Sequence, residues 1–420
     1  MTQDLLACLD VGTSKVCAFV AEVRDDTDYE ILGVGVTPAQ GIRGGMIVDV
    51  EQAGDSIQTA VEQAERSAGY EIGKAFVGLA GAEVRSHNSR GHVPISGHRT
   101  IDQDDIDGAL DAAHAIAIGH NREVLHIIPR NFVVDDQEGI RSPVGMHGFR
   151  LEVEAHIITA SKNAIHNLTK CVESAGVMVE QFVVTPLATA EVALTDAERD
   201  LGVVSCDIGG GTTDLAIFIE GNVWHTAVLA VGGQYITNDI AQGLRLPHDV
   251  AEQIKIDHGS ILVNDQDPDA VFSVRPFGHE DPIQLSHDDL AEIIEPRVEE
   301  FFELQLQEIK RSGYSGLLPA GVVLAGGTAM LPGICELAKD VLGLPVRIAE
   351  PHDLRGLVDQ IRGPAFATSI GLLNWAVRET LFSPKGPSRL LGGSDRMNPN
   401  GNGGSSLTGV VRKFLGRLAP

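Results

Sequence analysis

The sequence predicts an α/β protein made of two similar halves. A strand, an Asp-x-Gly turn and a second strand span residues 5–23, and the same pattern returns at residues 202–219, about 197 residues further on. Apolar strand patterns alternate with amphipathic helical patterns around both hairpins, as in α/β domains. Because 420 residues exceed what one hydrophobic core usually spans, we expect two or more subdomains.

Composition and charge exclude several other classes. Hydrophobic residues make up 43% of the chain and 47 residues are glycine, which argues against a disordered or fibrous protein. The net charge of −26 disfavours nucleic acid as a partner, because phosphate backbones bind basic faces. The five cysteines are far apart without a Cys-x-x-Cys pair, which fits a reducing cytosol better than disulfides or a zinc ribbon. The sequence has neither the basic start of a signal peptide nor about 18 consecutive apolar residues, so we expect neither secretion nor a membrane span.

Apolar spacing predicts the elements of the first half in order. Residues 5–23 form a β-hairpin, and residues 50–68 form a helix followed by a buried strand at 75–79. The pattern changes at residues 84–160, where short strands surround one helix, so an α+β module is expected there. Its elements are strands at 91–96, 124–134 and 151–160 and a helix at 102–117, capped by Thr100 or Asp102.

The α/β pattern then resumes and continues through the second half. Before the repeated hairpin we expect a helix at 163–174, a strand at 177–184 and a helix at 186–194. After the repeated hairpin we expect helices at 249–258, 286–311, 331–342 and 363–377, with a strand at 322–324.

The two hairpin turns carry residues suited to a nucleoside triphosphate with a metal ion. Backbone N–H groups of such turns can face phosphate oxygens, glycine allows a close approach, and carboxylates can hold the waters of a metal ion. Asp10 and Asp207 are therefore the candidate metal residues. Each turn alone could simply join two strands, but the pair favours binding. The other small and polar residues of these turns are Gly12, Thr13, Ser14 and Lys15 after Asp10, and Gly209, Gly210, Gly211, Thr212 and Thr213 after Asp207.

A third glycine motif, Gly326-Gly327-Thr328-Ala329, lies between a predicted strand and a predicted helix. Its backbone can pass close to a flat base or a phosphate, and the N-terminus of a helix favours an anion. Together with the two hairpins, in this order along the chain, it resembles the adenosine motif of the actin, Hsp70 and hexokinase superfamily. The two hairpins resemble the phosphate-binding loops of that superfamily.

Within the superfamily, residues 5 to about 378 and the tail resemble the FtsA family of bacterial cell-division proteins. The motifs that carry this resemblance are Val124–Pro129, Gln137–Ile140, Pro143–Gly145, Asp207–Thr212, Ile294–Arg297 and Ala325–Gly327. The resemblance implies an actin-like two-lobed ATPase fold, with ATP and Mg²⁺ bound in a cleft between residues 1–200 and 202–380. It implies that residues 12–15 bind one side of the phosphates and residues 209–213 the other. It also implies that adenosine lies on Gly326, Gly327 and Thr328. It also implies the division of the chain that follows: a lobe 1 core at 1–83 and 161–201, an inserted subdomain at 84–160, a lobe 2 core at 202–245 and 311–382, and a small lobe 2 subdomain at 246–310.

The resemblance also implies a function. An FtsA-like protein would tether FtsZ filaments to the cytoplasmic face of the cell inner membrane at the division site, assemble head to tail with itself and recruit later division proteins. The inserted subdomain would serve contacts between subunits and with those proteins. The C-terminal peptide of FtsZ would bind the small subdomain, where Arg297 is the candidate contact, although a solvated helix face would also explain that residue.

Further nucleotide contacts follow from the same resemblance. Glu252 and Lys255 lie three residues apart on one helix face, as the base and ribose contacts of the superfamily do, although an exposed ion pair would explain them as well. Gly232, Gly233 and Thr237 open a helix whose start could face the cleft or be ordinary helix capping.

Hydrolysis of ATP is expected to be slow or undetectable. In Hsp70-like proteins the segment corresponding to Val184–Ala188 carries a Glu that helps to position the attacking water, and this chain has Thr185 there. A hydroxyl cannot accept a proton from water or hold a metal shell as a carboxylate does. Asp207 remains the catalytic candidate, and Asp214 either assists it or caps its own turn.

The tail differs from the rest of the chain. From Arg378 to the end, seven Lys or Arg face two acidic residues, for a net charge of +5. Residues 383–405 contain 16 Gly, Pro, Ser or Asn among 23 residues, which predicts a flexible linker with a reach of roughly 25–30 Å. Residues 406–420 predict a basic amphipathic helix. The dozen residues from Leu407 to Leu418 that carry its pattern would span about 18 Å, too short to cross a bilayer, so the helix would lie on anionic membrane lipids. Its apolar face is Leu407, Val410, Val411, Phe414, Leu415 and Leu418, and its basic face is Arg412, Lys413 and Arg417.

Other interpretations stay open on the sequence alone. The tail helix could dock onto a partner protein or onto the body of the chain. A phosphotransferase of the sugar-kinase type would need a carboxylate in the first lobe that faces a substrate hydroxyl, and the sequence offers no convincing one. A pilus-assembly platform protein would share the fold and the insertion but not this tail, and an Hsp70-type chaperone would need a peptide-binding domain after about residue 380. The spacing of His87, His92 and His98 does not predict a zinc site.

Overall fold

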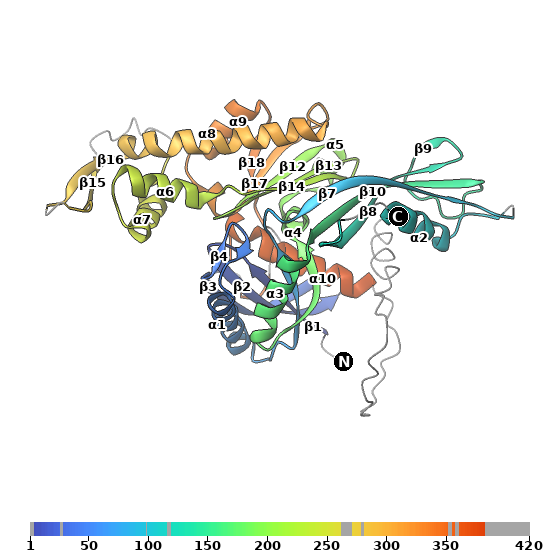
Figure 1. Ribbon diagram of the computed structural model, residues 1–420, viewed down its shortest axis with the longest axis horizontal. Coiled ribbons are helices and arrows are strands. Elements are labelled where there is room, and N and C mark those ends of the chain that lie inside the picture. The colour runs from blue at the N-terminus through green and yellow to red at the C-terminus, as the bar shows by residue number, and fades with distance from the viewer. Residues whose placement is uncertain are drawn as a thin grey trace. The chain divides into compact units, whose positions relative to one another are not determined.

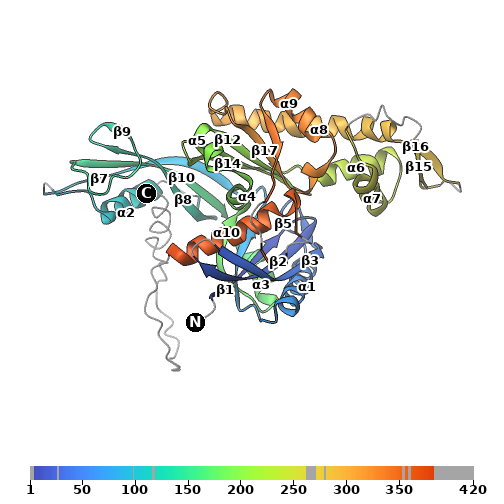
Figure 2. The same cartoon turned by 180° about the vertical axis from the view of Figure 1, so that it is seen from behind.

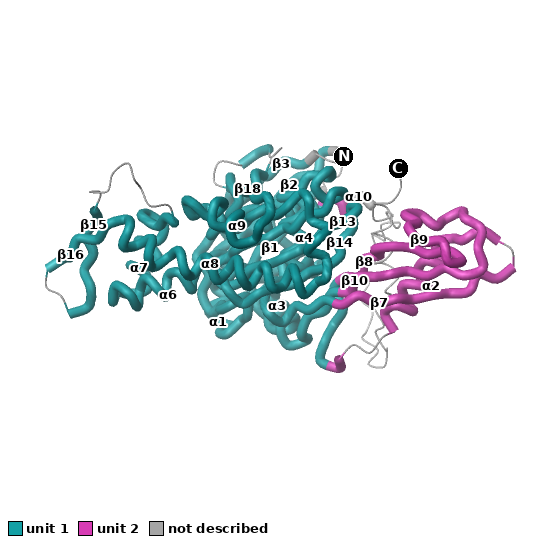
Figure 3. Tube along the Cα trace, turned by 90° about the horizontal axis from the view of Figure 1, so that it is seen from above, with its two compact units in different colours: residues 1–86, 121–125, 158–376 teal, residues 87–120, 126–157, 377–420 magenta. Residues whose placement is uncertain are grey.

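The computed structural model describes residues 4–25, 28–97, 99–115, 119–261, 271–278, 281–351, 355–357 and 361–382. The chain divides into two compact units, coloured in Figure 3: residues 1–86, 121–125 and 158–376 form unit 1, and residues 87–120, 126–157 and 377–420 form unit 2. The linker expected at 383–405 and the amphipathic helix expected at 406–420 lie outside the described residues. Among the helices that are described, none is long and apolar enough to cross a membrane.

The first sheet of unit 1 has the strand order β11-β6-β1-β2-β3 (Figure 1). β1 (Asp4–Val11) and β2 (Lys15–Asp25) form the predicted antiparallel hairpin, and β3 (Asp28–Pro38) extends it. β6 (Lys74–Leu79) runs parallel to β1, and β11 (Met178–Val184) runs parallel to β6. Helix α1 (Val50–Ala68) packs on β2 and β3 and against α3 (Lys162–Ser174), while β4 (Ile42–Arg43) and β5 (Met46–Ile47) form a short hairpin before α1.

The second sheet of unit 1 repeats this arrangement in the order β14-β13-β12-β17-β18 (Figure 2). β12 (Val203–Ile208) and β13 (Thr213–Ile219) form the second hairpin, and β14 (Asn222–Leu229) extends it. β17 (Gly321–Ala325) runs parallel to β12, as β6 does to β1, and β18 (Val346–Ile348) follows at the edge. The internal repeat predicted from the sequence is therefore a repeat of sheet topology.

The second sheet shares one hydrophobic core with the segment that follows it. That segment contains α6 (Gly233–Gly243), α7 (His248–His258), β15 (Val271–Val274), β16 (Ile283–Ser286) and α8 (His287–Ser312). Phe301 and Phe302 of α8 are fully buried and belong to the same apolar cluster as the strands β12, β13 and β17. The core of the second lobe thus continues into residues 246–310.

Two helices connect the sheets of unit 1. α4 (Thr185–Ala193) packs against strands of both sheets and leads through α5 (Asp196–Leu201) into β12. α10 (Ala367–Phe382) follows the 3₁₀ turn η2 (Pro364–Phe366) and crosses α4 at Gly371. A Cβ atom on Gly371 would lie 1.8 Å from the Ala188 carbonyl oxygen, so only glycine lets the two helices cross this closely.

Unit 2 is built around a four-stranded sheet with the strand order β7-β10-β8-β9. Its strands are β7 (Arg85–Pro94), β8 (Arg122–Val134), β9 (Gln137–Ile140) and β10 (Arg150–Ser161). The accompanying helix α2 (Gln103–His114) begins with a capping box in which the Asp102 side chain accepts from the backbone N–H of Asp105, as one of the two predicted caps requires. An α+β module therefore occupies the region where the sequence pattern changes.

Two predicted helices begin later than expected. The helix expected at 363–377 begins at Ala367, after η2, and ends at Phe382. The sequence predicted a helix at 331–342, directly after the third glycine motif, but Gly327–Met330 forms the 3₁₀ turn η1 and α9 spans only Ile334–Leu342. Pro332 disfavours helical geometry in the residue before it, and Gly333 adopts a left-handed φ of +87°. The glycine motif consequently forms the N-cap and most of a 3₁₀ turn, and the N-terminus of α9 is not available to it.

Candidate functional site

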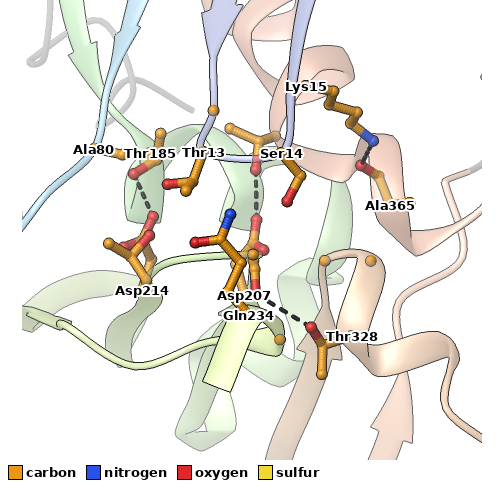
Figure 4. Close-up of a pocket in the computed structure, with 18 of the residues that line it drawn as sticks. Thr13, Ser14, Lys15, Ala80, Thr185, Asp207, Asp214, Gln234, Thr328 and Ala365 are labelled. Carbon is orange, nitrogen blue, oxygen red and sulfur yellow. Dashed lines mark hydrogen bonds between the residues drawn. The ribbon is translucent and has the colours of Figure 1, made fainter. Parts of the chain in front are cut away.

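A cavity of about 290 Å³ lies between the two hairpin turns of unit 1 (Figure 4). Both turns, the start of α6, helix α7 and the third glycine motif contribute to its lining. Most of the sequence-predicted binding residues meet here. They are Asp10, Gly12, Thr13, Ser14, Lys15, Asp207, Gly209, Gly210, Thr212, Gly233, Glu252, Lys255, Gly326, Gly327 and Thr328.

Three predicted residues lie behind the lining instead. Gly211 packs on Thr13, the buried Thr213 hydroxyl donates to the Val231 carbonyl (2.9 Å), and Gly232 is the N-cap of α6 without a side-chain cap. Thr237, one turn into α6, is fully buried and donates to the Gly233 carbonyl. These residues support the shape of the turns and the start of α6.

The two phosphate-type turns come into direct contact. A Cβ atom on Gly210 would lie 1.9 Å from the Ser14 hydroxyl oxygen and 3.2 Å from the Ser14 Cβ atom. The Thr13 hydroxyl accepts a hydrogen bond from the Gly45 N–H (3.0 Å), which ties the first turn to the β4–β5 hairpin. The cavity is closed on this side by turns that only glycine can bring together.

Three buried aspartates line the cavity, and each accepts a hydrogen bond from a hydroxyl on a connecting helix. Asp207 accepts from Thr189 of α4 (2.8 Å) and from Thr368 of α10, and these two hydroxyls lie 2.8 Å apart. Asp10 accepts from Ser369 of α10 (2.5 Å), one residue further along that helix. The carboxylates of both hairpins are therefore held by the helices that join the sheets.

Asp214 completes the set. Its Oδ2 atom accepts from Thr185 of α4, whereas its Oδ1 atom is buried without a hydrogen-bond partner (Figure 4). The sequence left open whether Asp214 assists Asp207 or caps its own turn. The hydrogen bond that Asp214 accepts comes from α4 and not from its own turn. A buried carboxylate oxygen without a partner is costly unless a cation or a proton satisfies it.

Burial raises the pKa of all three carboxylates. For Asp10, the Ser369 hydrogen bond and the Lys15 charge oppose that rise, whereas the Asp207 charge adds to it. For Asp207, hydrogen bonds from Thr368 and Thr189 and the Lys15 charge oppose it. For Asp214, burial and then the Asp207 charge raise the pKa to about 8, against the Thr185 hydrogen bond. A site that disfavours three adjacent negative charges favours a bound cation.

Both lysines of the cavity are held by neighbouring groups. The Lys15 ammonium donates to the Ala365 carbonyl (2.5 Å) and lies 3.7 Å from the centre of the Phe366 ring. Lys255 donates to the Glu252 carboxylate (2.8 Å) and to the Thr237 hydroxyl (2.9 Å). Glu252 and Lys255 thus form the i,i+3 ion pair that the sequence allowed, and this pair lines the cavity.

Several lining residues were missed by sequence reasoning. Ala80, Gln234, Ile256, Ala365 and Thr368 also contribute to the cavity. The Gln234 side chain points from the start of α6 toward Thr13 and Ser14 (Figure 4). Ile256, which follows Lys255 on α7, is 65% exposed, so its aliphatic surface is accessible to a ligand, and nothing in the local sequence pattern identifies it.

Arg297 lies on α8, away from this cavity. Its guanidinium forms a bidentate ion pair with Asp239 of α6 (2.5 and 3.1 Å) and also contacts Glu300. The carboxylate of Asp239 is the main cause of the raised pKa of Arg297, and the arginine side chain is 28% exposed. Arg297 therefore connects α8 to α6 and keeps part of its surface accessible.

These features define an actin-like protein with a nucleotide-type cleft between two related lobes. The solved PilM–PilN type IV pilus biogenesis complex has the same fold, with a TM-score of 0.66 and 18% identity over 89% of this chain and 98% of that one. MreB5 of Spiroplasma citri bound to ADP also shares it, with a TM-score of 0.54 and 16% identity over 88% of this chain and 95% of that one.

Sequence comparison identifies the family. The model of the cell division protein FtsA family matches residues 204–371, and the model of the SHS2 domain inserted in FtsA matches residues 81–159. The cell division protein FtsA of Pseudomonas aeruginosa is 44% identical over 375 residues, which cover 89% of this chain and 90% of the relative. The chain belongs to the FtsA family of cell division proteins. The predicted actin-like fold and the predicted family are both confirmed.

Proposed function

We propose that this chain binds ATP with Mg²⁺ in the cleft and uses the bound nucleotide to control assembly at the division site. The observation that carries the proposal is the convergence of three buried carboxylates and three glycine motifs on one cavity of about 290 Å³. Cavities of roughly 300 Å³ and above bind small molecules and cofactors. The phosphates would lie between Thr13 and Gly209, and the adenosine would lie between Gly327 and the exposed face of Ile256.

Mg²⁺ fits the site only in the company of a nucleotide. Among the described residues, no three His, Cys, Asp or Glu side chains are grouped so that they could hold a metal ion. Asp10 and Asp207 would instead hold the ion through its waters, with phosphate oxygens as the remaining ligands. The ion would neutralise charge on the phosphates, and it would also offset the unfavourable charge of the buried carboxylates.

Turnover is proposed to be slow. Thr185 donates its hydroxyl hydrogen to Asp214, so its oxygen can only accept a hydrogen bond from a water. Unlike a carboxylate, it cannot take a proton from that water as a general base. Asp207 stays the candidate for positioning a water. Thr189 and Thr368 both donate to its Oδ2 atom, so neither hydroxyl occupies its Oδ1 atom. Bound ATP would then keep the cleft in its nucleotide-bound state for long periods. This behaviour suits an assembly protein better than an enzyme.

At the level of the cell, we propose that the chain tethers FtsZ filaments to the cytoplasmic face of the inner membrane. It would assemble head to tail and recruit later division proteins, with the inserted SHS2 module as one contact. Membership in the FtsA family supports the role in division. The basic tail supports the membrane contact, since its apolar residues, from Leu407 to Leu418, and its cations would segregate on opposite faces of a helix.

Co-sedimentation with vesicles tests this proposal. The full chain and a chain ending at Phe382 are mixed with FtsZ, Mg-ATP and vesicles that contain anionic lipid, and FtsZ in the pellet is measured. We expect only the full chain to carry FtsZ down. Equal vesicle binding by the shortened chain would refute the tail as anchor, and absence of FtsZ from both pellets would refute the partner.

A control variant separates charge from apolar contact. Replacing Phe414 with Glu places a charge on the apolar face without changing the length of the tail, and we expect it to abolish pelleting. Replacing Arg417 with Gln should weaken pelleting only in part and make it less sensitive to salt, because each basic residue near an anionic surface contributes about 1 kcal/mol.

A further inference from the structure

A second cavity of about 280 Å³ lies in unit 1, beside the nucleotide-type cleft. It shares only Ala80 with the lining of that cleft. Its apolar wall comes from the first sheet, the β4–β5 hairpin and α3. The aliphatic side chains of that wall are Val11, Ile42, Ile47, Leu79 and Leu168. Polar side chains share the lining with this wall, so a pocket of this size suits a small molecule with one apolar part and one polar part.

The N-terminus of α3 opens into this cavity without a cap. Ser161 is the N-cap residue, yet its side chain makes no capping hydrogen bond, although serine is among the best N-cap residues. The Lys162 N–H donates to the Asn121 carbonyl (3.1 Å), which leaves the following N–H groups, those of Asn163 and Ala164, without a side-chain acceptor. The positive end of a 13-residue helix therefore faces the cavity.

The side chain of Ser161 also indicates a binding site in this cavity. Its side chain lines the cavity and is only 7% exposed, and among the described residues its hydroxyl has no hydrogen-bond partner. The hydroxyl is therefore free to donate a hydrogen bond to an acceptor bound in the cavity. Asn163 and Asn167, one turn apart on α3, place two further amide groups beside it.

The charge of the surroundings favours an acceptor that carries a negative charge. The first turn of α3 contains no acidic residue, and Lys162 stands at its first position. Glu83 is the only acidic side chain in the lining, and it is exposed, so water screens its charge. Charge-assisted hydrogen bonds to helix N–H groups are stronger than those made by a neutral carbonyl.

We propose that this cavity binds a small aliphatic carboxylate. The carboxylate oxygens accept from the free N–H groups of α3 and from the Ser161 hydroxyl, and the aliphatic chain lies against Ile42, Ile47 and Leu168. The site is separate from the proposed nucleotide site and does not depend on it.

The test uses the full chain, labelled at the isoleucine δ1 methyl groups, and three probes with the same hydrocarbon chain. Hexanoate, hexanamide and 1-hexanol are titrated separately while the methyl signals of Ile42 and Ile47 are followed. We expect saturable shifts with hexanoate and at least about fivefold weaker binding of the two neutral probes. Equal affinity for the three probes would show an unspecific apolar crevice and overturn the proposal, as would the absence of any shift.

Two variants localise the binding. Ser161→Ala removes a hydroxyl that bonds nothing, so the fold is retained, and we expect hexanoate to bind at least about threefold more weakly while 1-hexanol is unaffected. Ala164→Leu keeps a helix-forming residue and fills the cavity, so we expect all three probes to lose binding. Unchanged hexanoate affinity in Ser161→Ala, or unchanged shifts in a folded Ala164→Leu chain, would contradict the proposed site.

Discussion

Thr185 of α4 donates a hydrogen bond to Asp214 of β13, and so links a helix that contacts both sheets to the strand that follows the second phosphate-type turn. The resemblance to Hsp70-like proteins predicts a carboxylate at this position, and the chain has a hydroxyl there instead. A second carboxylate at this position would repel Asp214, whose pKa burial already raises to about 8. The threonine is therefore matched to its acidic neighbour, because its hydroxyl donates a hydrogen bond where a carboxylate would add a negative charge.

The raised pKa of Asp214 predicts how stability depends on pH. Between about pH 4 and pH 8 the unfolded chain releases this proton and the folded chain keeps it, so stability falls as pH rises through that range. One such proton contributes at most about 1.4 kcal/mol per pH unit. We expect Asp214→Asn to flatten the pH dependence of Tm for the nucleotide-free chain between pH 5 and 8.

The matched control for this prediction is Asp340→Asn, an exposed position on α9. It should leave the pH profile of Tm unchanged. Thr185→Val removes the hydrogen bond that lowers the pKa of Asp214, so the falling limb of the profile should extend to higher pH. A profile that Asp214→Asn leaves untouched would show that Asp214 ionises normally in the folded chain.

Adjacent glycines of the third motif should respond differently to alanine. Gly326 has a φ of +88°, and a Cβ atom there would lie 2.4 Å from both the Asp207 Oδ1 atom and the Ile208 carbonyl oxygen, whereas one on Gly327 would meet nothing within 4 Å. We expect Gly326→Ala to lower Tm by several degrees and to weaken ATP binding at least tenfold. Both effects are measurable by thermal melting and titration calorimetry.

Gly327→Ala tests the placement of adenosine. This variant should keep the Tm of the parent chain and still bind ATP more weakly, because the added methyl group would occupy space proposed for the nucleotide. If both Tm and affinity stay at parental values, adenosine does not lie against Gly327.

The ion pair between Arg297 and Asp239 allows the role of Arg297 in partner binding to be tested. If Arg297 contacts the FtsZ peptide directly, Arg297→Ala should weaken peptide binding about tenfold, whereas Asp239→Ala should free the guanidinium and preserve or strengthen binding. Fluorescence anisotropy with a labelled peptide measures both. If the two variants weaken binding equally, Arg297 acts only by holding α8 to α6.

Thr368 should matter for the metal more than for the nucleotide. Thr368→Val removes one of the two hydroxyls that donate to Asp207, so the pKa of Asp207 should rise further and its carboxylate should be less available to a cation. We expect ATP affinity to fall about fivefold with Mg²⁺ present and to change little with EDTA. An equal loss under both conditions would indicate a general distortion of the cleft.

The repeated hairpins could be predicted because their apolar alternation and turn residues are local properties of the sequence. Asp10 and Asp207 could be placed in one cavity because each lies near the end of the first strand of its hairpin, and that strand is central in its own sheet. The start of α9 could not be predicted from apolar spacing, since Pro332 and Gly333 interrupt a pattern that otherwise reads as helical. The adjacent Pro332 and Gly333 were the signal in the sequence that the helix begins only after them.

The hydroxyls around the carboxylates could not be predicted for a different reason. Thr189, Thr368 and Ser369 reach Asp207 and Asp10 only because α4 and α10 cross at Gly371, a contact between segments about 180 residues apart. No single-sequence pattern encodes such a crossing. The placements of Gly211, Thr213 and Gly232 behind the lining depend likewise on how the turns meet in three dimensions.

Helix α10 touches both phosphate-side carboxylates with its first turn and runs without interruption to Phe382, where the chain continues into the basic tail. Sixteen residues of helix form a stiff rod of about 24 Å. A pulling force applied to the chain beyond Phe382 would be delivered along this rod to Thr368 and Ser369. Tension on an anchored molecule would thus act as a mechanical load on the very hydroxyls that hold Asp207 and Asp10.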